Sequence, residues 1–490
     1  MTIAPTTSSL SSIAVDVVVM AAGKGTRMKS RLPKVLHRLA GRPLLAHVLR
    51  TAAGLGARRV VVVTGHGADE VEAAIPAWQL GADVRCVRQS PQLGTGHAVQ
   101  QAVPALAGDG VVLVLSGDVP LIGEDTLRAL VEASGGERLA LLTIDLPDPT
   151  GYGRVLRDAS GGVQAIVEHK DATEAQRQVR EIYSGVMAAP ARALAGWLAR
   201  LSNDNAQGEY YLTEVVGMAV AEGLSVVAQK TTDALQVAGI NSPAQLAALE
   251  RDWQRRQAQR LMDAGVRLAD PARFDLRGEL ECAADVEIDI NCIFEGRVSL
   301  GEGVRIGAHC VISDARIEAG AVIHPYTHIA GEAAGVVVGA GALIGPYARL
   351  RPGAQLGREV HIGNFVEVKN STLADGAKAN HLAYLGDATV GARVNYGAGS
   401  ITANYDGANK HRTVIGDDVH VGSNCVLIAP VTIGAGGTIG GGSTISKSTE
   451  PGGLTVARAV GIEHVRCIGA ATPLPARQGV GGEGRVLHLR

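Results

Sequence analysis

Residues 415–445 read IGDDVHVGSNCVLIAPVTIGAGGTIGGGSTI and place an aliphatic side chain at every sixth position. The series consists of Ile415, Val421, Leu427, Ile433, Ile439 and Ile445. A helix buries a side chain about every 3.6 residues and a strand every second residue, so neither produces this spacing. A period of six is typical of a parallel β-helix, whose coils have three flat faces and stack their aliphatic side chains inside.

An earlier segment keeps the same spacing, at Val338, Ile344, Leu350, Leu356, Ile362 and Val368. Glycine or another small residue often follows, as the tight corners of such a coil require. We therefore expect hexapeptide repeats from about residue 285 to about residue 447. The polar segment 402–412 (TANYDGANKHR) interrupts them with residues that no coil needs, and such an insertion usually marks a binding face.

The first half of the chain has a different sequence pattern. Short apolar runs at 15–20, 60–64 and 111–115 alternate with helical segments such as 44–55. This pattern is typical of the buried parallel strands of a Rossmann-like α/β domain. We expect that domain to span residues 14–241 and a helical linker, capped by Ser242, to span 242–264. The β-helix domain would then cover 265–469, with flexible tails at 1–13 and 470–490.

Composition excludes several classes of protein. The formal net charge of −2 predicts no attraction to nucleic acid or to an anionic membrane surface. The six cysteines show no zinc-like spacing, and Cys310 and Cys425 occupy repeat positions that predict core packing. No apolar run approaches the roughly 20 residues of a transmembrane helix, and residues 1–12 do not resemble a signal peptide. We expect a cytoplasmic protein.

A small-residue loop follows the first predicted strand. Its sequence, AAGKGTRM at 21–28, lets backbone N–H groups approach a phosphate. A Walker A motif would need glycine where this chain has Val18, so a P-loop NTPase is not expected. Arg27 and Lys34 add two cations nearby, and the combination predicts phosphate binding.

Two further segments belong with this loop. QSPQLGTGH at 89–97 combines side-chain amides with a glycine turn, which suits base edges and ribose oxygens. Ser116-Gly117-Asp118 follows the run at 111–115, where the ligand-binding edge of a parallel sheet is expected. One carboxylate in that place is a usual way to hold Mg²⁺ beside substrate phosphates. Taken alone, Asp118 could equally cap the turn at Val119-Pro120.

The β-helix by itself could be only a scaffold, so its polar residues carry the functional prediction. A lone histidine is more often structural, which is how we interpret His309, His324, His328, His361 and His420. His381 differs because it lies within the polar segment NHLAYLGD at 380–387. An imidazole with an unperturbed pKa near 6.5 can take a proton from an amine that attacks a thioester.

These motifs together resemble a known family. They are AAGKGTRM, LPKVLH, QLGTGHA, GDVPL, GYGR, VEHKDA, GEYYLTE, GNFVEVK, HLAYLGD and NYDGANKH. The N-terminal half resembles the sugar-nucleotide pyrophosphorylases. From about Val15 to Arg458, the chain resembles the bacterial bifunctional N-acetylglucosamine-1-phosphate uridylyltransferases / glucosamine-1-phosphate acetyltransferases. This resemblance implies a left-handed β-helix, a homotrimer, and two consecutive steps towards UDP-N-acetylglucosamine.

For the N-terminal domain, the resemblance implies transfer of UMP from UTP to N-acetylglucosamine 1-phosphate. The implied nucleotide contacts are Ala21, Ala22, Gly23, Lys34, Gln89, Gly94, Thr95 and Ser116, and the implied sugar contacts are Gly153, Glu168, Tyr183 and Asn241. Asp118 and Asn241 would hold Mg²⁺, while Arg27 and Lys34 would oppose the negative charge of the leaving pyrophosphate. Tyr183 is a departure, because the family often carries asparagine there.

For the C-terminal domain, the resemblance implies acetyl transfer from acetyl-CoA to glucosamine 1-phosphate, with His381 as the general base. Arg351 and Lys369 would bind the sugar phosphate, and Tyr384 and Asn395 would place the sugar. The acetyl-CoA site would be lined by Ala398, Asn404, Tyr405, Ser423, Gly441 and Arg458. Gly441 replaces a family alanine, a change that backbone contacts should tolerate.

Two other interpretations compete with this prediction. The chain could be a nucleotidylyltransferase whose β-helix only assembles the oligomer, but His381, Asn395 and the insertion at 402–412 argue against it. It could also be a non-catalytic sugar-nucleotide sensor or scaffold. A scaffold would have no need of Arg27, Lys34, Asp118 and Asn241 together.

Overall fold

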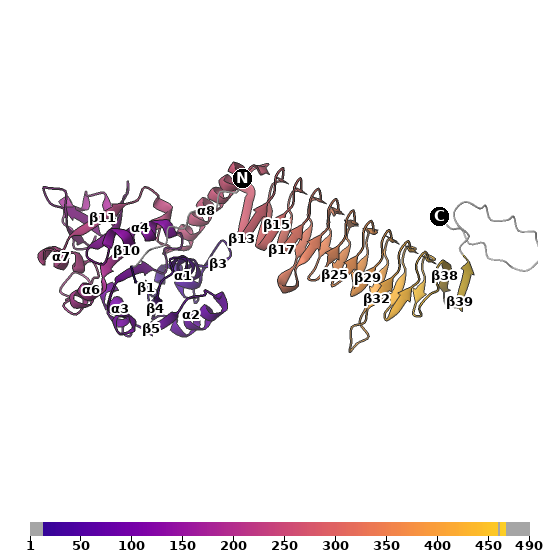
Figure 1. Cartoon of the computed structure of the whole chain (residues 1–490), viewed down its shortest axis with the longest axis horizontal. Helices are drawn as coiled ribbons and strands as arrows, with labels where there is room; N and C mark the ends of the chain where they lie inside the picture. The colour runs from indigo at the N-terminus through magenta and orange to yellow at the C-terminus, as the bar shows by residue number, and fades with distance from the viewer. Residues whose placement is uncertain (1–12, 459–460, 467–490) are drawn as a thin grey trace, which may run out of the picture. The chain divides into compact units, whose positions relative to one another are not determined.

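The computed structural model describes residues 13–458 and 461–466, so the predicted tails fall outside the description apart from Ile13. The chain divides into two compact units between Gln257 and Ala258. Figure 1 shows the first as an α/β unit and the second as a stack of coils. Among the residues described, no helix has both the length and the apolarity to cross a membrane.

A nine-stranded sheet forms the centre of the first unit. Its parallel part consists of β5 (Val84–Arg88), β4 (Arg59–Thr64), β1 (Val15–Met20) and β6 (Val111–Ser116). The sheet continues through β10 (Glu181–Pro190), β7 (Leu139–Asp145) and β11 (Val226–Lys230), and β8 (Arg154–Arg157) and β9 (Val163–Val167) form a hairpin beside β10. The three predicted strands are therefore confirmed as the middle of this sheet.

Both faces of the sheet are covered, which explains the continuous apolar runs. Val17 and Val19 point into one core with α1 (Leu44–Gly54) and α4 (Glu124–Ser134). Val18 points into the opposite core, which is covered by α3 (Thr95–Ala102), α6 (Ala191–Leu198) and α7 (Glu214–Ala221). The parallel strands β1, β4 and β6 thus end at one edge, where their loops converge.

The predicted linker is a helix, α8 (Pro243–Asp263). The Ser242 hydroxyl accepts a hydrogen bond from Gln245 N at 3.3 Å, and the Gln245 side chain accepts one from Asn241 N at 2.8 Å. Ser242 therefore caps the helix as predicted, but Gln245 reaches the residue before the cap, so the pair is a variant of the capping box. Leu249 of α8 is buried with Met28, Leu39 and Leu44 of the first unit, and the division between the two units falls inside α8.

Residues after α8 form the predicted β-helix. Ile415 pairs with Ile433, Val421 with Ile439 and Leu427 with Ile445, each pair separated by three repeats. The side chains of this series are at most 3% exposed, so the six-residue period marks the interior. Cys310 and Cys425 are fully buried, as predicted.

The strands of the β-helix form two long sheets, which are parallel apart from the antiparallel pair β38 (Gly453–Arg458) and β39 (Gly461–Arg466) at the end of one. One contains β24 (His361–Asn364), β27 (Lys378–His381) and β30 (Asn395–Tyr396). The other contains β22 (Arg349–Leu350), β25 (Glu367–Lys369), β28 (Tyr384–Gly386) and β31 (Ile401–Ala403). After β31 the predicted insertion leaves the coil, pairs Tyr405 with Lys410, and returns at β32 (Thr413–Ile415). It is the loop that protrudes beside β32 in Figure 1.

Candidate active sites

The small-residue loop at the end of β1 combines buried and open positions. Ala21 and Ala22 are buried, whereas a Cβ added at Gly23 would have nothing within 4 Å. Gly25 has φ 57°, and a Cβ there would lie 2.7 Å from Lys34 Cβ. Glycine is therefore required at 25 for the loop to turn over Lys34, while the space at Gly23 is free for a ligand.

Lys34 joins two oxygens from distant parts of the chain. Its Nζ lies 2.5 Å from Asp118 Oδ2 and 3.1 Å from Asn241 Oδ1. The Asn241 segment is tied to the end of β6 by a hydrogen bond from Ile240 N to Asp118 O at 3.0 Å. Arg27 does not share this cluster; it is exposed and makes no ion pair within the part of the chain that the structure describes.

The two oxygens around Lys34 suit a hard divalent cation. A carboxylate and an amide oxygen are ligands that Mg²⁺ accepts, and they converge on one point that the lysine ammonium now fills. No group of three or more His, Cys, Asp or Glu residues that could hold a metal occurs among the residues described. Substrate phosphates and water would therefore have to supply the remaining ligands.

The loop after β5 is held by its own polar contacts. Gln89 is buried, and its Nε2 donates to Gly94 O at 2.9 Å. Thr95 Oγ1 accepts from Leu212 N at 3.0 Å, which ties the start of α3 to the segment before α7. Ser116 ends β6, and a Cβ added at Gly185 would lie 3.2 Å from its hydroxyl. The predicted nucleotide contacts thus line the carboxyl ends of β1, β5 and β6.

Three of the four predicted sugar contacts, Gly153, Glu168 and Tyr183, form a second group beside β10, whereas Asn241 lies with Lys34. Tyr183 N donates to Gly153 O at 3.0 Å, and a Cβ added at Gly153 would lie 3.7 Å from both Glu168 carboxylate oxygens. Thr213, which the sequence did not single out, donates to Glu168 Oε1 at 3.0 Å. Burial raises the pKa of Glu168.

Tyr183 fills the position where the family often carries asparagine. Its side chain is 7% exposed, and its hydroxyl is buried without a hydrogen-bond partner among the residues described. Burial also raises the pKa of this phenol, with the nearby Glu168 charge adding to the effect. A buried hydroxyl without a partner loses the hydrogen bonds it would make in water, and a polar ligand can restore them.

His381 in the second unit has a partner that the sequence analysis did not identify. Its Nδ1 lies 2.7 Å from Asn364 Oδ1, and the two residues pair in register on β24 and β27. An amide oxygen only accepts, so Nδ1 carries the proton and Nε2 is left as the basic nitrogen. The register of the repeats could have found Asn364, since it occupies the place of His381 one coil earlier.

The predicted phosphate ligands lie on the other sheet. Arg351 Nη1 lies 2.8 Å from Glu367 Oε1, and this hydrogen bond raises the pKa of Arg351. The pKa of Lys369 is lowered by burial and then by the neighbouring cations Lys410 and Arg351. Lys410 comes from the insertion and was not predicted. The local excess of positive charge suits a phosphate group.

The predicted base and the predicted phosphate ligands occupy neighbouring faces of the coil. His381 and the exposed Asn395 belong to the sheet of β27, whereas Tyr384 pairs in register with Glu367 on the other sheet. The two faces meet at Leu382, a corner residue with φ 49° that is 60% exposed. A single chain therefore spreads these groups around a corner.

The predicted acetyl-CoA contacts lie further along the coils. Asn404 donates to the buried Asp387, and Tyr405 is 62% exposed and donates to Gly407 O at 2.6 Å. A Cβ added at Gly441 would lie 3.4 Å from Ser423 O, so an alanine fits there. Ala398 accepts from Asn424 N at 2.7 Å. Arg458 ends β38 (Gly453–Arg458), and its side chain lies outside the described residues.

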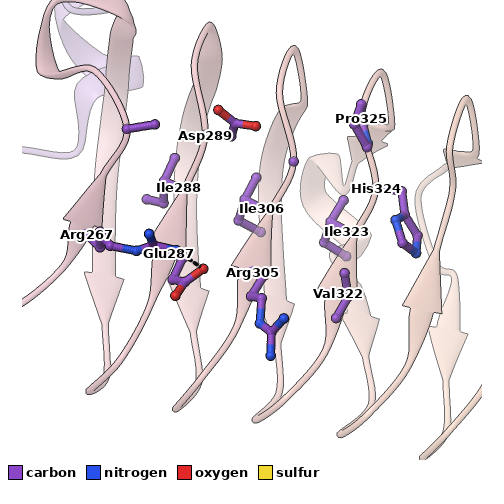
Figure 2. A pocket seen from close by; sticks show the side chains of 12 residues that line it. Arg267, Glu287, Ile288, Asp289, Arg305, Ile306, Val322, Ile323, His324 and Pro325 are labelled. Carbon is purple, nitrogen blue, oxygen red and sulfur yellow. Dashed lines mark ion pairs between the residues drawn. The ribbon is translucent and has the colours of Figure 1, made fainter.

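A separate hollow lies on the first coils of the β-helix, as Figure 2 shows. Ile288, Ile306 and Ile323 lie along it, and Arg267 and Glu287 form an ion pair at one end. The residues predicted for the two activities line none of it. The two sites above therefore remain the candidates.

Comparison with known proteins identifies both halves of the chain. Residues 17–206 match the family model of the MobA-like NTP transferase domain, and residues 335–370 and 412–447 match that of the bacterial transferase hexapeptide (six repeats). These matches confirm the predicted fold class, with a nucleotidyltransferase domain followed by hexapeptide repeats.

Relatives match along nearly the whole chain. Bifunctional protein GlmU of Paracidovorax citrulli is 76% identical over 454 residues, which is 91% of this chain and 96% of that protein. Proteins of the same name from Methylibium petroleiphilum and an Azoarcus species are 72% and 58% identical, each over 91% of this chain and 96% of their own length. The predicted pair of transferase activities is thereby confirmed, and the chain belongs to the family of bifunctional GlmU proteins.

Proposed function

We propose that the C-terminal unit transfers acetyl from acetyl-CoA to glucosamine 1-phosphate, and that the N-terminal unit then transfers UMP from UTP to the product, releasing pyrophosphate. The observation that carries this proposal is that each unit holds its own polar cluster. Lys34, Asp118 and Asn241 meet in the first, and His381 and Asn364 in the second.

In the N-terminal unit, the chain's own contribution is positioning and charge neutralisation, as phosphoryl transfer requires. Gly23 leaves space for the nucleotide phosphates, and Gln89, Gly94 and Thr95 hold the base and ribose. Lys34 and Arg27 stabilise the negative charge of the departing pyrophosphate. Ala21, Ala22 and Ser116 shape the same edge of the sheet, while Gly153, Glu168, Tyr183 and Asn241 hold the sugar phosphate.

Asp118 and Asn241 are proposed to hold Mg²⁺, because their oxygens already converge on a cation. When bound, Mg²⁺ supplies charge neutralisation on the phosphates. Lys34 then has to leave these two oxygens and turn towards the phosphates, a movement of one flexible side chain.

In the C-terminal unit, Asn364 keeps the proton of His381 on Nδ1, so Nε2 can take a proton from the sugar amine. The amine nitrogen attacks the thioester carbon, the carbon–sulfur bond breaks, and the proton taken by His381 passes to the departing sulfur, so that CoA leaves as the thiol. Arg351 and Lys369 bind the sugar phosphate, with Lys410 added from the insertion. Tyr384 and Asn395 place the sugar, and Ala398, Asn404, Tyr405, Ser423, Gly441 and Arg458 line the acetyl-CoA site.

A homotrimer is proposed as the active assembly. The base and the phosphate ligands lie on neighbouring faces of one chain, so a second copy is needed to enclose the substrates. A ladder of stacked rings at one corner, His309, Tyr326, Tyr347 and Phe365, supports such a contact. Tyr326, Tyr347 and Phe365 are 48–56% exposed, which is unusual for contiguous aromatic side chains unless a partner covers them.

The trimer is tested by sedimentation of the full chain and of Tyr347→Glu. We expect a mass of about three chains for the first and of one chain for the second, because a charge would be buried in the contact. A monomeric wild-type protein that retains acetyl transfer would refute the proposal.

A cytoplasmic location is also proposed, since UTP and acetyl-CoA are cytoplasmic metabolites.

The two activities are tested with the purified full chain and Mg²⁺. One reaction contains acetyl-CoA and glucosamine 1-phosphate and follows the free CoA thiol. The other contains UTP and N-acetylglucosamine 1-phosphate and follows pyrophosphate. We expect both products; pyrophosphate alone would leave the β-helix as an assembly device.

A further inference from the structure

The Gln89 amide is held in one orientation by two neighbours. Its Nε2 lies 2.9 Å from Gly94 O and 3.1 Å from His97 Nδ1, and the side chain is 4% exposed. A backbone carbonyl can only accept, so the nitrogen and not the oxygen of the amide faces Gly94. This contact settles which end of the amide is which, a choice that the shape of the side chain alone leaves open.

The same contact settles the tautomer of His97. Because Gln89 Nε2 donates to it, His97 Nδ1 must be an acceptor, and the neutral ring then carries its proton on Nε2. The Gln101 amide, further along α3, lies 3.2 Å from His97 Nε2 and can accept that proton through its oxygen once the amide is turned over. With the Gln101 amide turned over, Gln101, His97, Gln89 and Gly94 would form one continuous chain of hydrogen bonds.

The remaining atom of the Gln89 amide is its oxygen. Within the residues that the structure describes, Gln89 Oε1 makes no hydrogen bond and is not sealed from solvent. Gln89 lies at the carboxyl end of β5, beside Thr64 at the end of β4, where Gln89 N donates to Thr64 O at 2.8 Å. The Gln89 side chain thus offers one fixed acceptor, and no free donor, at the ligand-binding edge of the sheet.

We propose that His97 is a positioning residue that makes Gln89 distinguish uracil from cytosine. The inference rests on the proposed uridylyltransferase function. The ring nitrogen N3 of uracil carries a hydrogen that Gln89 Oε1 can accept, whereas N3 of cytosine is itself an acceptor and is repelled. An amide that could rotate would offer its NH₂ group to cytosine and its oxygen to uracil. Because His97 and Gly94 hold Nε2, Gln89 cannot offer its NH₂ group to cytosine.

Two amide variants of the full-length protein test this role. In His97→Asn, the side-chain oxygen takes the place of Nδ1 and can still accept from Gln89. In His97→Gln, the polar group takes the place of Nε2 instead, and Gln89 loses its second acceptor. Initial rates of pyrophosphate release would be measured with UTP and with CTP, and acetyl transfer by the same preparations serves as the control for folding.

We expect His97→Gln to raise KM for UTP about fivefold, with kcat within about twofold, and to lower the UTP-to-CTP ratio of kcat/KM by at least about fivefold. His97→Asn should keep the wild-type ratio. The proposal would be overturned if His97→Gln and His97→Asn had the same UTP-to-CTP ratio of kcat/KM, whether that ratio is unchanged or reduced. A purely structural role of His97 would affect the two variants alike. Failure of the wild-type protein to release pyrophosphate from UTP would instead refute the proposed function.

Discussion

Asn364 and His381 occupy the same place in successive coils, and the amide oxygen of the first lies 2.7 Å from Nδ1 of the second. The β-helix thereby converts a sequence repeat into a hydrogen bond between a proposed base and the residue that orients it. The bond leaves Nε2 as the nitrogen that accepts a proton. In many functional histidines the hydrogen bond at one ring nitrogen sets the role of the other in this way.

Removing the amide oxygen of Asn364 should therefore impair His381 as a base while leaving the imidazole in place. We expect Asn364→Leu to lower kcat for acetyl transfer by about tenfold or more, because His381 loses its orientation and tautomer. Asn364→Asp is the matched control, since its carboxylate still accepts from Nδ1, and it should retain most of the activity. Release of CoA thiol is the measurement, and equal rates for the leucine and aspartate variants would contradict the assignment.

Lys34 and a divalent cation are expected to compete for the same two oxygens. In Lys34→Met, Asp118 and Asn241 become available without displacing an ammonium, so Mn²⁺ used as a probe should bind the substrate-free protein more tightly. Uridylyl transfer should nevertheless fall by about 100-fold or more, because a cation facing the phosphates is lost. Mn²⁺ binding can be followed by titration calorimetry.

The exposed Lys24 in the same loop provides the control for that change. Lys24→Met should leave Mn²⁺ binding by the free protein unchanged. Weaker Mn²⁺ binding in Lys34→Met than in the wild-type protein would show that the lysine does not occupy the metal position.

The hydroxyl of Tyr183, which has no hydrogen-bond partner in the described part of the chain, gives one expectation for stability and one for substrate binding. Tyr183→Phe removes a buried polar atom without a partner, so the unliganded N-terminal unit should become more stable by about 1 kcal/mol. If the hydroxyl donates to the sugar, KM for N-acetylglucosamine 1-phosphate should rise about fivefold while KM for UTP stays unchanged. Thermal unfolding and initial rates measure the two effects. An unchanged KM for the sugar would mean that Tyr183 makes no polar contact with it.

Asp233 makes the stability of the first unit sensitive to acid. A hydrogen bond from Arg256 is the main cause that lowers the pKa of Asp233 from 3.8 to about 2. Because the folded pKa lies below the unfolded one, this stabilisation is present above pH 3.8 and is lost as the pH falls towards 2.

Asp233→Asn should therefore lower the urea midpoint at pH 6 and reduce its fall between pH 4 and about pH 2.5. Asp252→Asn on α8 is the control, because Asp252 forms its ion pair with Arg255 of the same helix and acts on Arg256 only as the last of the causes that raise the pKa of that residue. A parallel pH dependence in the wild-type protein and the Asp233 variant would contradict the assignment.

The sequence predicted the features that repeat or that end a strand. The six-residue series located the interior of the β-helix, and the runs at 15–20, 60–64 and 111–115 located the central strands. Asp118 could be singled out because residues at the carboxyl ends of parallel strands share one edge, and Lys34 because it is a second cation after the small-residue loop.

Partnerships between side chains of distant segments could not be predicted in the same way. Thr213 shows no unusual spacing, and its contact with Glu168 appears only when the start of α7 meets the end of β9. The repeat register could have located Asn364, but its hydrogen bond with His381 appears only when β24 meets β27. Lys410 lies in an insertion whose path no repeat dictates. That Tyr183 has no hydrogen-bond partner among the described residues also follows from packing, because the sequence of a strand does not show whether a tyrosine hydroxyl is paired.

The central claim is that one chain carries two independent active sites. Asp118→Ala and His381→Ala would each be assayed for pyrophosphate release from UTP and for CoA release from acetyl-CoA. We predict that Asp118→Ala loses the first activity and keeps the second, and that His381→Ala does the reverse. Loss of both activities in either folded variant would contradict the claim.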